Sequence, residues 1–332
     1  MKKILVIQTA FIGDVVLATA VVEKLAIYFP NSHIDFLVRS GNESLLANNP
    51  HISETLIWIK KEKKYKNLFA IIKKIRKNKY DLVINLQRYF TTGFITALSG
   101  AKEKRGFDKN PLSFFFTKKV KHIISTTPPY KHEVERNNEL ISDITDDSLS
   151  RPKMYPSQND FAKVEPYIHQ PYVTLTPSSV WFTKQYPLQK WVELMDNLPP
   201  HLKIYLLGGK TNTAECDVLA AASKNKNAVV LAGELSFLQS AALMKTAVMN
   251  YVNDSAPLHF ASAVNAPVTA IFCSTIPAFG FTPLSDVAHI VERLEPLYCR
   301  PCGLHGKKQC PEGHFKCGFE INVDQLLQTL PA

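Results

Sequence analysis

The stretch AVMNYVNDSAPLHFASAVNAPVTAIFC, residues 247–273, predicts a buried strand, a polar turn, a short helix and a second buried strand. Asn253, Asp254 and Ser255 form the turn, and Pro257 suits the first helical turn because no N–H is needed there. Asp254 or Ser255 can cap the helix. The stretch therefore places a helix N-terminus at the carboxyl end of a strand, where phosphate groups or sugar hydroxyls bind.

The same helix also has a purely structural interpretation. His259 lies four residues after Ser255, so their side chains share one helix face. Taken alone, this pattern favours a capped helix with a histidine in the core. Two further stretches, described below, favour a binding site.

Strands and helices alternate on both sides of this stretch, which predicts an α/β protein with two doubly wound, Rossmann-like domains. Residues 148–170 hold several prolines and no strand pattern, which indicates a linker. We expect an N-terminal domain over 1–155, a C-terminal domain over 165–320 and a closing helix over 321–332, with strand ends facing across a cleft. Expected strands are 4–8, 34–38, 56–59, 82–85, 105–107, 172–176, 204–207, 229–231, 248–252 and 268–272; expected helices are 14–28, 68–78, 91–98, 134–144, 191–198, 214–223, 237–245 and 323–330.

Composition is that of a globular protein: 332 residues, with 45% apolar and 20% charged. A run of about 18 uncharged apolar residues, which a membrane span requires, does not occur. The opening KKILVIQTAFIG has the outline of a signal peptide, but Gln8 and Asp14 interrupt it. We therefore expect a first β-strand and a cytoplasmic protein.

The positive charge is concentrated in one segment. Residues 60–79 hold nine lysines and one arginine against Glu62, a net charge of +9 out of +10 for the whole chain. Apolar residues recur within the segment at helical spacing, which predicts an amphipathic helix with a cationic outer face. A solvated face is the plain interpretation. The concentration of charge indicates instead an anionic surface nearby, either acidic lipid or nucleic acid.

The first strand-to-helix turn, residues 9–14 (TAFIGD), lacks the G-x-G-x-x-G fingerprint of dinucleotide binding. It places Asp14 at a helix start, directly after Gly13. A first-turn carboxylate also has a structural explanation, since it complements the helix dipole. That dipole is expected to keep Asp14 ionised and therefore a weak base, which suffices for an oxocarbenium-like transition state.

A second turn, residues 176–187 (TPSSVWFTKQYP), follows the first strand of the C-terminal half. Ser178 and Ser179 allow close backbone approach, and Lys184 supplies a positive charge for phosphate. The turn is not a Walker-type phosphate loop. Gly208 and Gly209, after the next strand, give another permissive turn on the same edge.

Gly13-Asp14, Lys184-Gln185-Tyr186-Pro187 and the D-S-x-P-x-H segment of residues 254–259 occur in this order, and together they resemble the family 9 glycosyltransferases, the ADP-heptose:lipopolysaccharide heptosyltransferases. The resemblance covers nearly the whole chain. It implies a GT-B fold with the acceptor on the N-terminal domain and the sugar nucleotide on the C-terminal one. It also implies inverting transfer of heptose from ADP-heptose without a metal cofactor.

Carried over residue by residue, the resemblance makes Asp14 the general base and Lys184 the cation that stabilises the departing ADP. Asp254 would hold the heptose hydroxyls, and Ser255 with the amides after it would meet the pyrophosphate. The expected substrate-binding residues are Gly13, Ser178, Ser179, Gly208, Gly233, Asp254, Ser255, Ala256 and His259.

Two parts of the expected site differ from the family pattern or lack a motif. Trp181 and Phe182 replace smaller residues before the lysine. Adenine is expected at the turn over residues 232–236, which contains Gly233.

Four cysteines follow one another closely near the C-terminus, as Cys299-x2-Cys302-x7-Cys310-x6-Cys317. In a cytosolic chain such spacing is consistent with a structural zinc site, and free thiols are the alternative. A similar cysteine-bearing tail is found in the heptosyltransferase II type. Cys216 and Cys273 fall in predicted core elements and are expected to serve packing.

The expected function is therefore inverting heptosyl transfer to the lipopolysaccharide core, by an enzyme that lies peripherally on the cytoplasmic face of the inner membrane. One alternative keeps the GT-B fold and uses another sugar nucleotide or acceptor. A second is a basic, zinc-containing nucleic-acid-binding protein. Only Tyr65 and Phe69 interleave with the lysines, so the base-stacking surface of such a protein is missing and no nucleic-acid partner is expected.

Overall fold

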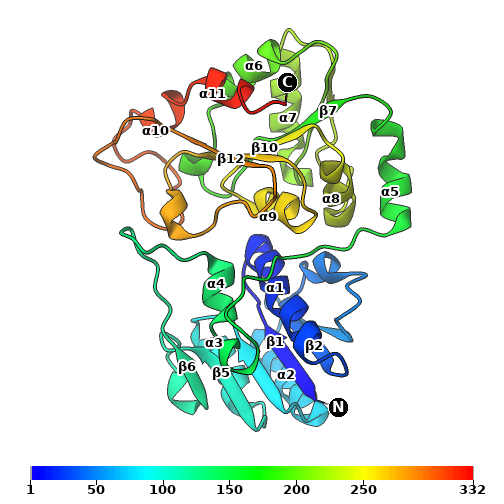
Figure 1. Ribbon diagram of the computed structural model, residues 1–332, viewed down its shortest axis with the longest axis vertical. Helices are drawn as coiled ribbons and strands as arrows, with labels where there is room; N and C mark the ends of the chain where they lie inside the picture. Colours follow the sequence, from blue (N-terminus) through cyan, green and yellow to red (C-terminus); the bar gives the residue numbers. More distant parts are fainter. Residues whose placement is uncertain (1, 332) are drawn as a thin grey trace. The chain divides into compact units, whose positions relative to one another are not determined.

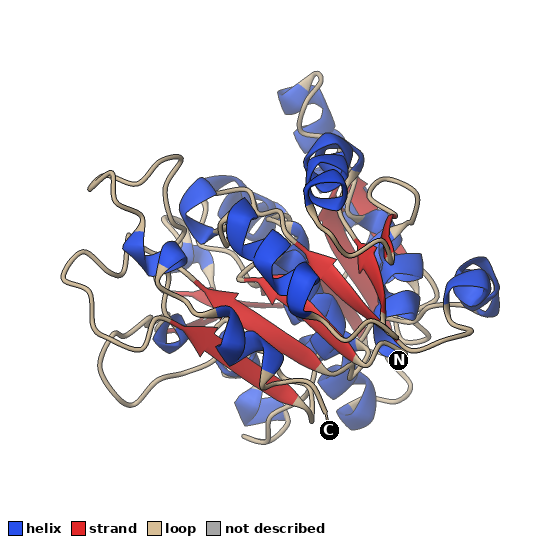
Figure 2. Ribbon diagram, turned by 90° about the horizontal axis from the view of Figure 1, so that it is seen from above, coloured by secondary structure: helices blue, strands red, loops and turns tan. Residues whose placement is uncertain are grey.

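The computed structural model describes residues 2–331 and divides the chain into two compact units. Unit 1 contains residues 2–125 and Lys131–Tyr155. Unit 2 contains Thr126–Tyr130 and residues 156–331. Each unit is built around its own parallel sheet, with helices on both sides of the strands (Figures 1 and 2).

The described part of unit 1 holds a six-stranded sheet in the order β3-β2-β1-β4-β5-β6, and every neighbouring pair is parallel. Central strands form from continuous apolar runs, as in the fully buried Ile4–Ile7, because helices cover both faces. Its elements are β1 (Lys3–Ile7), α1 (Ile12–Tyr28), β2 (His33–Arg39), β3 (Glu54–Trp58), α2 (Lys64–Asn78), β4 (Leu82–Asn85), α3 (Phe90–Leu98), β5 (Glu103–Phe107), β6 (Lys118–Val120) and α4 (Glu133–Asn138).

The described part of unit 2 repeats this topology in the order β12-β11-β10-β7-β8-β9, again wholly parallel. Its core surrounds the fully buried Trp191 of α6, and α11 packs against that helix. Its elements are α5 (Gln158–Val164), β7 (Tyr172–Thr176), α6 (Leu188–Asn197), β8 (Lys203–Leu206), α7 (Thr213–Ala222), β9 (Ala228–Val230), α8 (Phe237–Lys245), β10 (Met249–Asn253), α9 (Ala256–Ala263), β11 (Val268–Phe272), β12 (Ala288–Glu292), α10 (Lys316–Phe319) and α11 (Val323–Leu327).

The strand order decides where each unit can bind a ligand. In both sheets the order reverses next to the unit's first strand, between β1 and β4 and between β7 and β10. Ligands of doubly wound folds bind at the carboxyl ends of the strands at such a switch point. In unit 1 this point carries residues 8–14, and in unit 2 it carries the turns after Thr176 and Asn253.

The predicted class, α/β with two doubly wound sheets, is confirmed. Edge strands β6 and β12 were not predicted, because an edge strand need not carry an apolar run. The helix expected over 134–144 ends at Asn138, and the Thr145 hydroxyl bonds the carbonyl of Ile141 beyond it. Within the expected linker, Ser157 and Asp160 form a capping box that begins α5.

No helix within residues 2–331 combines the length and the apolar character that a membrane span needs.

Candidate active site

Asn253, at the end of β10, joins the two motifs of unit 2. Its side-chain oxygen accepts a hydrogen bond from the backbone N–H of Tyr186 at 2.9 Å. Its amide donates to the carbonyl of Pro177 at 2.5 Å. This fully buried side chain therefore ties the loop that carries Lys184 to the turn before α9.

Lys184 and Asp254 form a buried ion pair at this switch point. The distance from Nζ of Lys184 to Oδ2 of Asp254 is 2.7 Å, and the two side chains are 15% and 8% exposed. The hydroxyl of Thr275, which follows β11, donates to the same carboxylate oxygen at 2.6 Å. One oxygen of Asp254 is thus held by two partners from different segments.

The start of α9 differs from the predicted capping arrangement. Ser255 is the N-cap residue, but its side chain makes no capping hydrogen bond, and Asp254 faces Lys184 instead. The Ser255 hydroxyl is buried and has no hydrogen-bond partner among residues 2–331. The first amides of a helix have no carbonyl partner within it. Hydroxyl and amides together match the oxygens of an anionic group.

The other predicted residues of unit 2 occupy nearby strand ends. The N–H of Gly233 donates to the carbonyl of Gly208 at 2.9 Å, so the turns after β8 and β9 lie side by side. The hydroxyl of Ser178 bonds Oε2 of Glu215 at 2.7 Å, and the carbonyl of Ser179 accepts from Gln185. His259 is 5% exposed within α9, and Ala256 is the first residue of that helix.

In unit 1, Asp14 lies in the first turn of α1, directly after Gly13. Its carboxylate accepts a hydrogen bond from the N–H of Phe11 at 3.2 Å, and the residue is half-buried. Burial and then the negative charge of Glu133 raise its pKa to about 6, against the smaller opposing effects of the Phe11 N–H and Arg88. Asp14 is therefore a stronger base than predicted, because desolvation and Glu133 outweigh the hydrogen bonds and the Arg88 charge that lower its pKa.

Glu133, the residue that acts on Asp14, is itself kept ionised. It begins α4, which packs against α1. Burial raises the pKa of Glu133, but His122 and Arg136 outweigh burial and lower it. Oε2 of Glu133 lies 2.7 Å from Nε of Arg136 and 3.4 Å from Nε2 of His122. A stable negative charge therefore acts on Asp14 near neutral pH.

Lys60, after β3, was missed by the sequence reasoning. Its Nζ donates to the carbonyl of Thr9 at 2.9 Å and to its hydroxyl at 3.1 Å, and lies over the Trp58 ring at 4.6 Å. Burial and the nearby charges of Arg39 and Lys64 lower its pKa to about 8. The sequence signal for Lys60 was a basic residue soon after a parallel strand. The many lysines that follow made this residue hard to single out.

Comparison with known proteins identifies the family of the chain. Residues 68–315 match the model of "Glycosyltransferase family 9 (heptosyltransferase)". The chain belongs to glycosyltransferase family 9. This family 9 enzyme is 29% identical over 284 residues to lipopolysaccharide heptosyltransferase 3 of Escherichia coli, covering 80% of this chain and 82% of that one. It is 23% identical over 357 residues to lipopolysaccharide heptosyltransferase 2 of E. coli K12, covering 99% and 98%.

The fold of this glycosyltransferase is likewise shared with its family. The solved structure of E. coli ADP-heptose lps heptosyltransferase II superimposes with a TM-score of 0.81 at 19% identity, covering 99% of this chain and 97% of that one. Together with the two doubly wound sheets, this likeness confirms the GT-B class.

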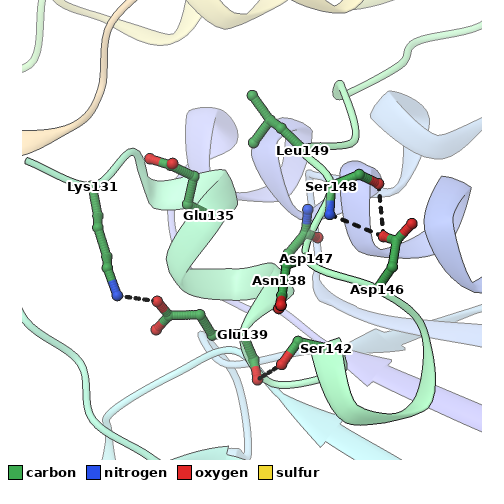
Figure 3. Close-up of a pocket in the computed structure, with 9 residues that line it drawn as sticks. All are labelled: Lys131, Glu135, Asn138, Glu139, Ser142, Asp146, Asp147, Ser148 and Leu149. Carbon is green, nitrogen blue, oxygen red and sulfur yellow. Dashed lines mark hydrogen bonds and ion pairs between the residues drawn. The ribbon is translucent and has the colours of Figure 1, made fainter.

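A pocket of about 250 Å³ in unit 1 of the glycosyltransferase lies outside the predicted site (Figure 3). Lys131 points toward Glu139, and Asp146 accepts hydrogen bonds from Ser148. Its lining holds four carboxylates and one lysine, a charge that repels phosphate. The lining residues are Lys131, Glu135, Asn138, Glu139, Ser142, Asp146, Asp147, Ser148 and Leu149.

One of the four tail cysteines of the glycosyltransferase, Cys317, has a pKa that burial and its neighbouring cysteines raise. Burial, then Cys302 and Cys310, raise the pKa of Cys317 to about 12. Sγ of Cys299 lies 4.0 Å from Nε2 of His314. Among residues 2–331, no three or more His, Cys, Asp or Glu side chains are arranged to hold a metal ion. The zinc site at the four tail cysteines therefore stays a prediction, and we derive no step through a metal.

Proposed function

We propose that this family 9 enzyme transfers heptose from ADP-heptose to the inner core of lipopolysaccharide with inversion at the anomeric carbon. The observation that carries the proposal is the grouping of Lys184, Asp254 and the Ser255 hydroxyl at the start of α9. A cation, a carboxylate and a helix N-terminus supply what a sugar diphosphate needs. The relatives named lipopolysaccharide heptosyltransferase and ADP-heptose heptosyltransferase support this choice of substrates.

The proposed reaction is a single displacement. The acceptor hydroxyl oxygen forms a bond to the anomeric carbon of heptose while the bond from that carbon to the pyrophosphate oxygen breaks. Asp14 takes the hydroxyl proton, for which a pKa of about 6 is well placed near neutral pH. ADP leaves with the bonding electrons, and Lys184 and the α9 amides stabilise its charge. One displacement from the opposite face inverts the anomeric configuration.

Asp254 is proposed to bind both Lys184 and the heptose hydroxyls. In the structure its Oδ2 is shared between Lys184 and Thr275. A carboxylate accepts about four hydrogen bonds through its two oxygens, so capacity remains for heptose hydroxyls. Lys184 has three donors and can bind Asp254 and a phosphate oxygen at the same time.

The acceptor is proposed to bind cationic side chains of unit 1 through its own negatively charged groups. Lys60 follows β3, Arg39 ends β2 and Arg88 follows β4. All three lie at the edge of the sheet that carries Asp14. Parallel strands end at the same edge, so these cations gather near one another. An acceptor with phosphate or carboxylate groups, as in a lipopolysaccharide core, is complementary to them.

We further propose peripheral binding to an anionic membrane on the cytoplasmic side, through a basic-aromatic surface on α2 and α3. The Phe69 and Phe94 rings meet edge-on at 6.4 Å, and Phe90 stacks on Phe94 at 6.2 Å. Tyr65, Phe69 and Phe90 are 71%, 57% and 58% exposed. Exposed rings beside lysines suit a lipid headgroup layer. The exposed lysines of this surface are Lys61, Lys63, Lys64, Lys66, Lys73, Lys74, Lys77 and Lys79.

The transfer is tested with purified protein, ADP-heptose and core lipopolysaccharide from a heptose-deficient strain. Mass spectrometry should show the gain of one heptose, and NMR should show the inverted anomer. UDP- and GDP-sugars serve as competing sugar donors. Transfer from one of these but not from ADP-heptose would replace the proposal with a GT-B enzyme of another specificity. Salt-dependent DNA binding without sugar-nucleotide binding would favour the nucleic-acid alternative.

A further inference from the structure

The segment that carries the first two tail cysteines packs directly behind Lys184. Thr183, the residue before Lys184, donates its N–H to the carbonyl of Lys307 at 3.1 Å. In return the N–H of Lys307 donates to the Thr183 hydroxyl at 2.7 Å. Two backbone-anchored hydrogen bonds thus fix the short helical turn Phe182–Lys184 to the segment over residues 299–307.

Ser274 extends this connection to the carboxylate partner of the lysine. Its hydroxyl donates to the Thr183 hydroxyl at 2.9 Å, and its carbonyl accepts from the N–H of Cys302 at 2.9 Å. Ser274 is fully buried and precedes Thr275, which bonds Asp254. The segment therefore supports both members of the Lys184–Asp254 pair.

Gly306 is the point of closest approach. Its φ is +76°, in the left-handed region that favours glycine. A Cβ there would lie 2.9 Å from Cγ of Lys184, 2.9 Å from the Thr183 hydroxyl and 3.2 Å from the Ser274 hydroxyl. These distances are below normal contact, so the backbone of Gly306 lies against the stem of the lysine.

We propose that the segment over residues 299–307 is a positioning element for Lys184, with Gly306 as its positioning residue. A lysine stem has many rotamers, and binding a diphosphate with it is costly unless the stem is already held. The backbone of Gly306 confines that stem in the rotamer that directs Nζ to Asp254. The inference rests on the proposed role of Lys184 in binding the sugar donor.

The test compares Gly306→Ala with Gly313→Ala. Gly313 lies in the same cysteine-bearing tail with φ +70°, but a Cβ there meets no described atom within 4 Å. Both changes impose left-handed strain, and only Gly306→Ala presses on the lysine. We expect Gly306→Ala to weaken ADP binding and raise the KM for ADP-heptose by about 10-fold or more, as overpacking predicts. Gly313→Ala should stay within about twofold of wild type.

Thr183 provides a second, conservative test. Thr183→Val removes the hydroxyl that Lys307 and Ser274 bond, whereas Thr183→Ser keeps it. We expect the valine variant to lose ADP affinity and the serine variant to retain it, at comparable melting temperatures. Equal ADP affinity of the two variants would remove the hydroxyl from any positioning role.

A double-mutant cycle separates positioning from general stability. If Gly306 acts through Lys184, Gly306→Ala in a Lys184→Ala background should weaken ADP binding no further. Additive losses, or equal behaviour of the Gly306 and Gly313 variants, would overturn the positioning role. If Lys184→Ala alone leaves ADP affinity unchanged, the proposed function of the lysine fails first. If that variant loses affinity while Gly306→Ala does not, only the positioning role of Gly306 fails.

Discussion

Nζ of Lys184 lies 2.7 Å from Oδ2 of Asp254, and both side chains are largely buried. A buried pair of this kind contributes little net stability, because desolvation of the charges offsets their attraction. Losing one partner, however, costs about 3–5 kcal/mol in comparable cases, since the other charge is left uncompensated. The pair is therefore best understood as a preorganised charge arrangement, and its disruption should affect binding and stability together.

Lys184→Ala should weaken ADP-heptose binding and slow transfer. A charge-assisted hydrogen bond contributes about 1.5–3 kcal/mol, which corresponds to roughly 10- to 150-fold in affinity. Calorimetry with ADP measures the loss below the melting temperature of the variant. Lys190→Ala is the matched control, because that lysine pairs with the partly exposed Glu193 on α6. Unchanged affinity and a normal rate would remove Lys184 from the site.

Asp14→Asn should reduce turnover by about 100- to 10,000-fold, the usual contribution of a general base. Affinity for ADP should stay close to wild type, because the proton transfer is made only in the transition state. Asparagine can still accept the Phe11 N–H, so α1 should begin as before. A variant that retains more than about a tenth of the wild-type rate would contradict the role.

The pH profile offers a test of the charges around Asp14. Because the base must be ionised, kcat/KM should fall as pH drops below about 6, the value to which its pKa is raised. Glu133→Gln removes a charge that raises this pKa, so the acid limb should move to lower pH. Arg88→Met removes a charge that lowers it, so the limb should move to higher pH. Shifts in the same direction, or none, would show that another group titrates.

The basic-aromatic surface should govern binding to vesicles. Phe69→Ser with Phe90→Ser, or Lys73→Gln with Lys77→Gln, should weaken binding to anionic vesicles, the lysine effect being largest at low salt. Phe114→Ser is a control, because Phe114 is 67% exposed and lies outside this surface. Lys74 pairs with Glu54 and is left intact. Turnover on a delipidated acceptor should hardly change, and equal loss on both acceptors would contradict a membrane role.

The zinc expectation stays a prediction, and metal analysis of the purified protein decides it. If the four tail thiols hold zinc, it should appear at about one equivalent per chain and should be lost in Cys302→Ser or Cys310→Ser. Chelation should then lower the melting temperature, because a metal that binds only the folded state stabilises it. Metal-free protein with four titratable tail thiols would establish the free-thiol alternative.

The two predicted site motifs of unit 2 show how much of the candidate site the sequence predicts. Residues 253–259 and 184–187 were each recognisable, and their positions after strands placed them at one sheet edge. The ion pair between Lys184 and Asp254 was not predictable from the sequence. It depends on the Asn253 side chain, which hydrogen-bonds a loop far away in the chain and so holds it beside the turn before α9. Likewise Gly306 gave no signal, since its role exists only against the stem of the lysine.

The local features of this protein follow from its amino-acid sequence. They are the apolar runs that form buried strands, a proline and small polar residues that begin α9, and an acidic residue in the first turn of α1. These depend on residues close together in the chain, and local sterics and hydrogen bonding decide them. The raised pKa of Asp14 comes from the tertiary structure, because burial and then Glu133, more than a hundred residues away in the chain, produce it. Burial and charge act through space, so a pKa belongs to the folded arrangement rather than to the residue or its helix.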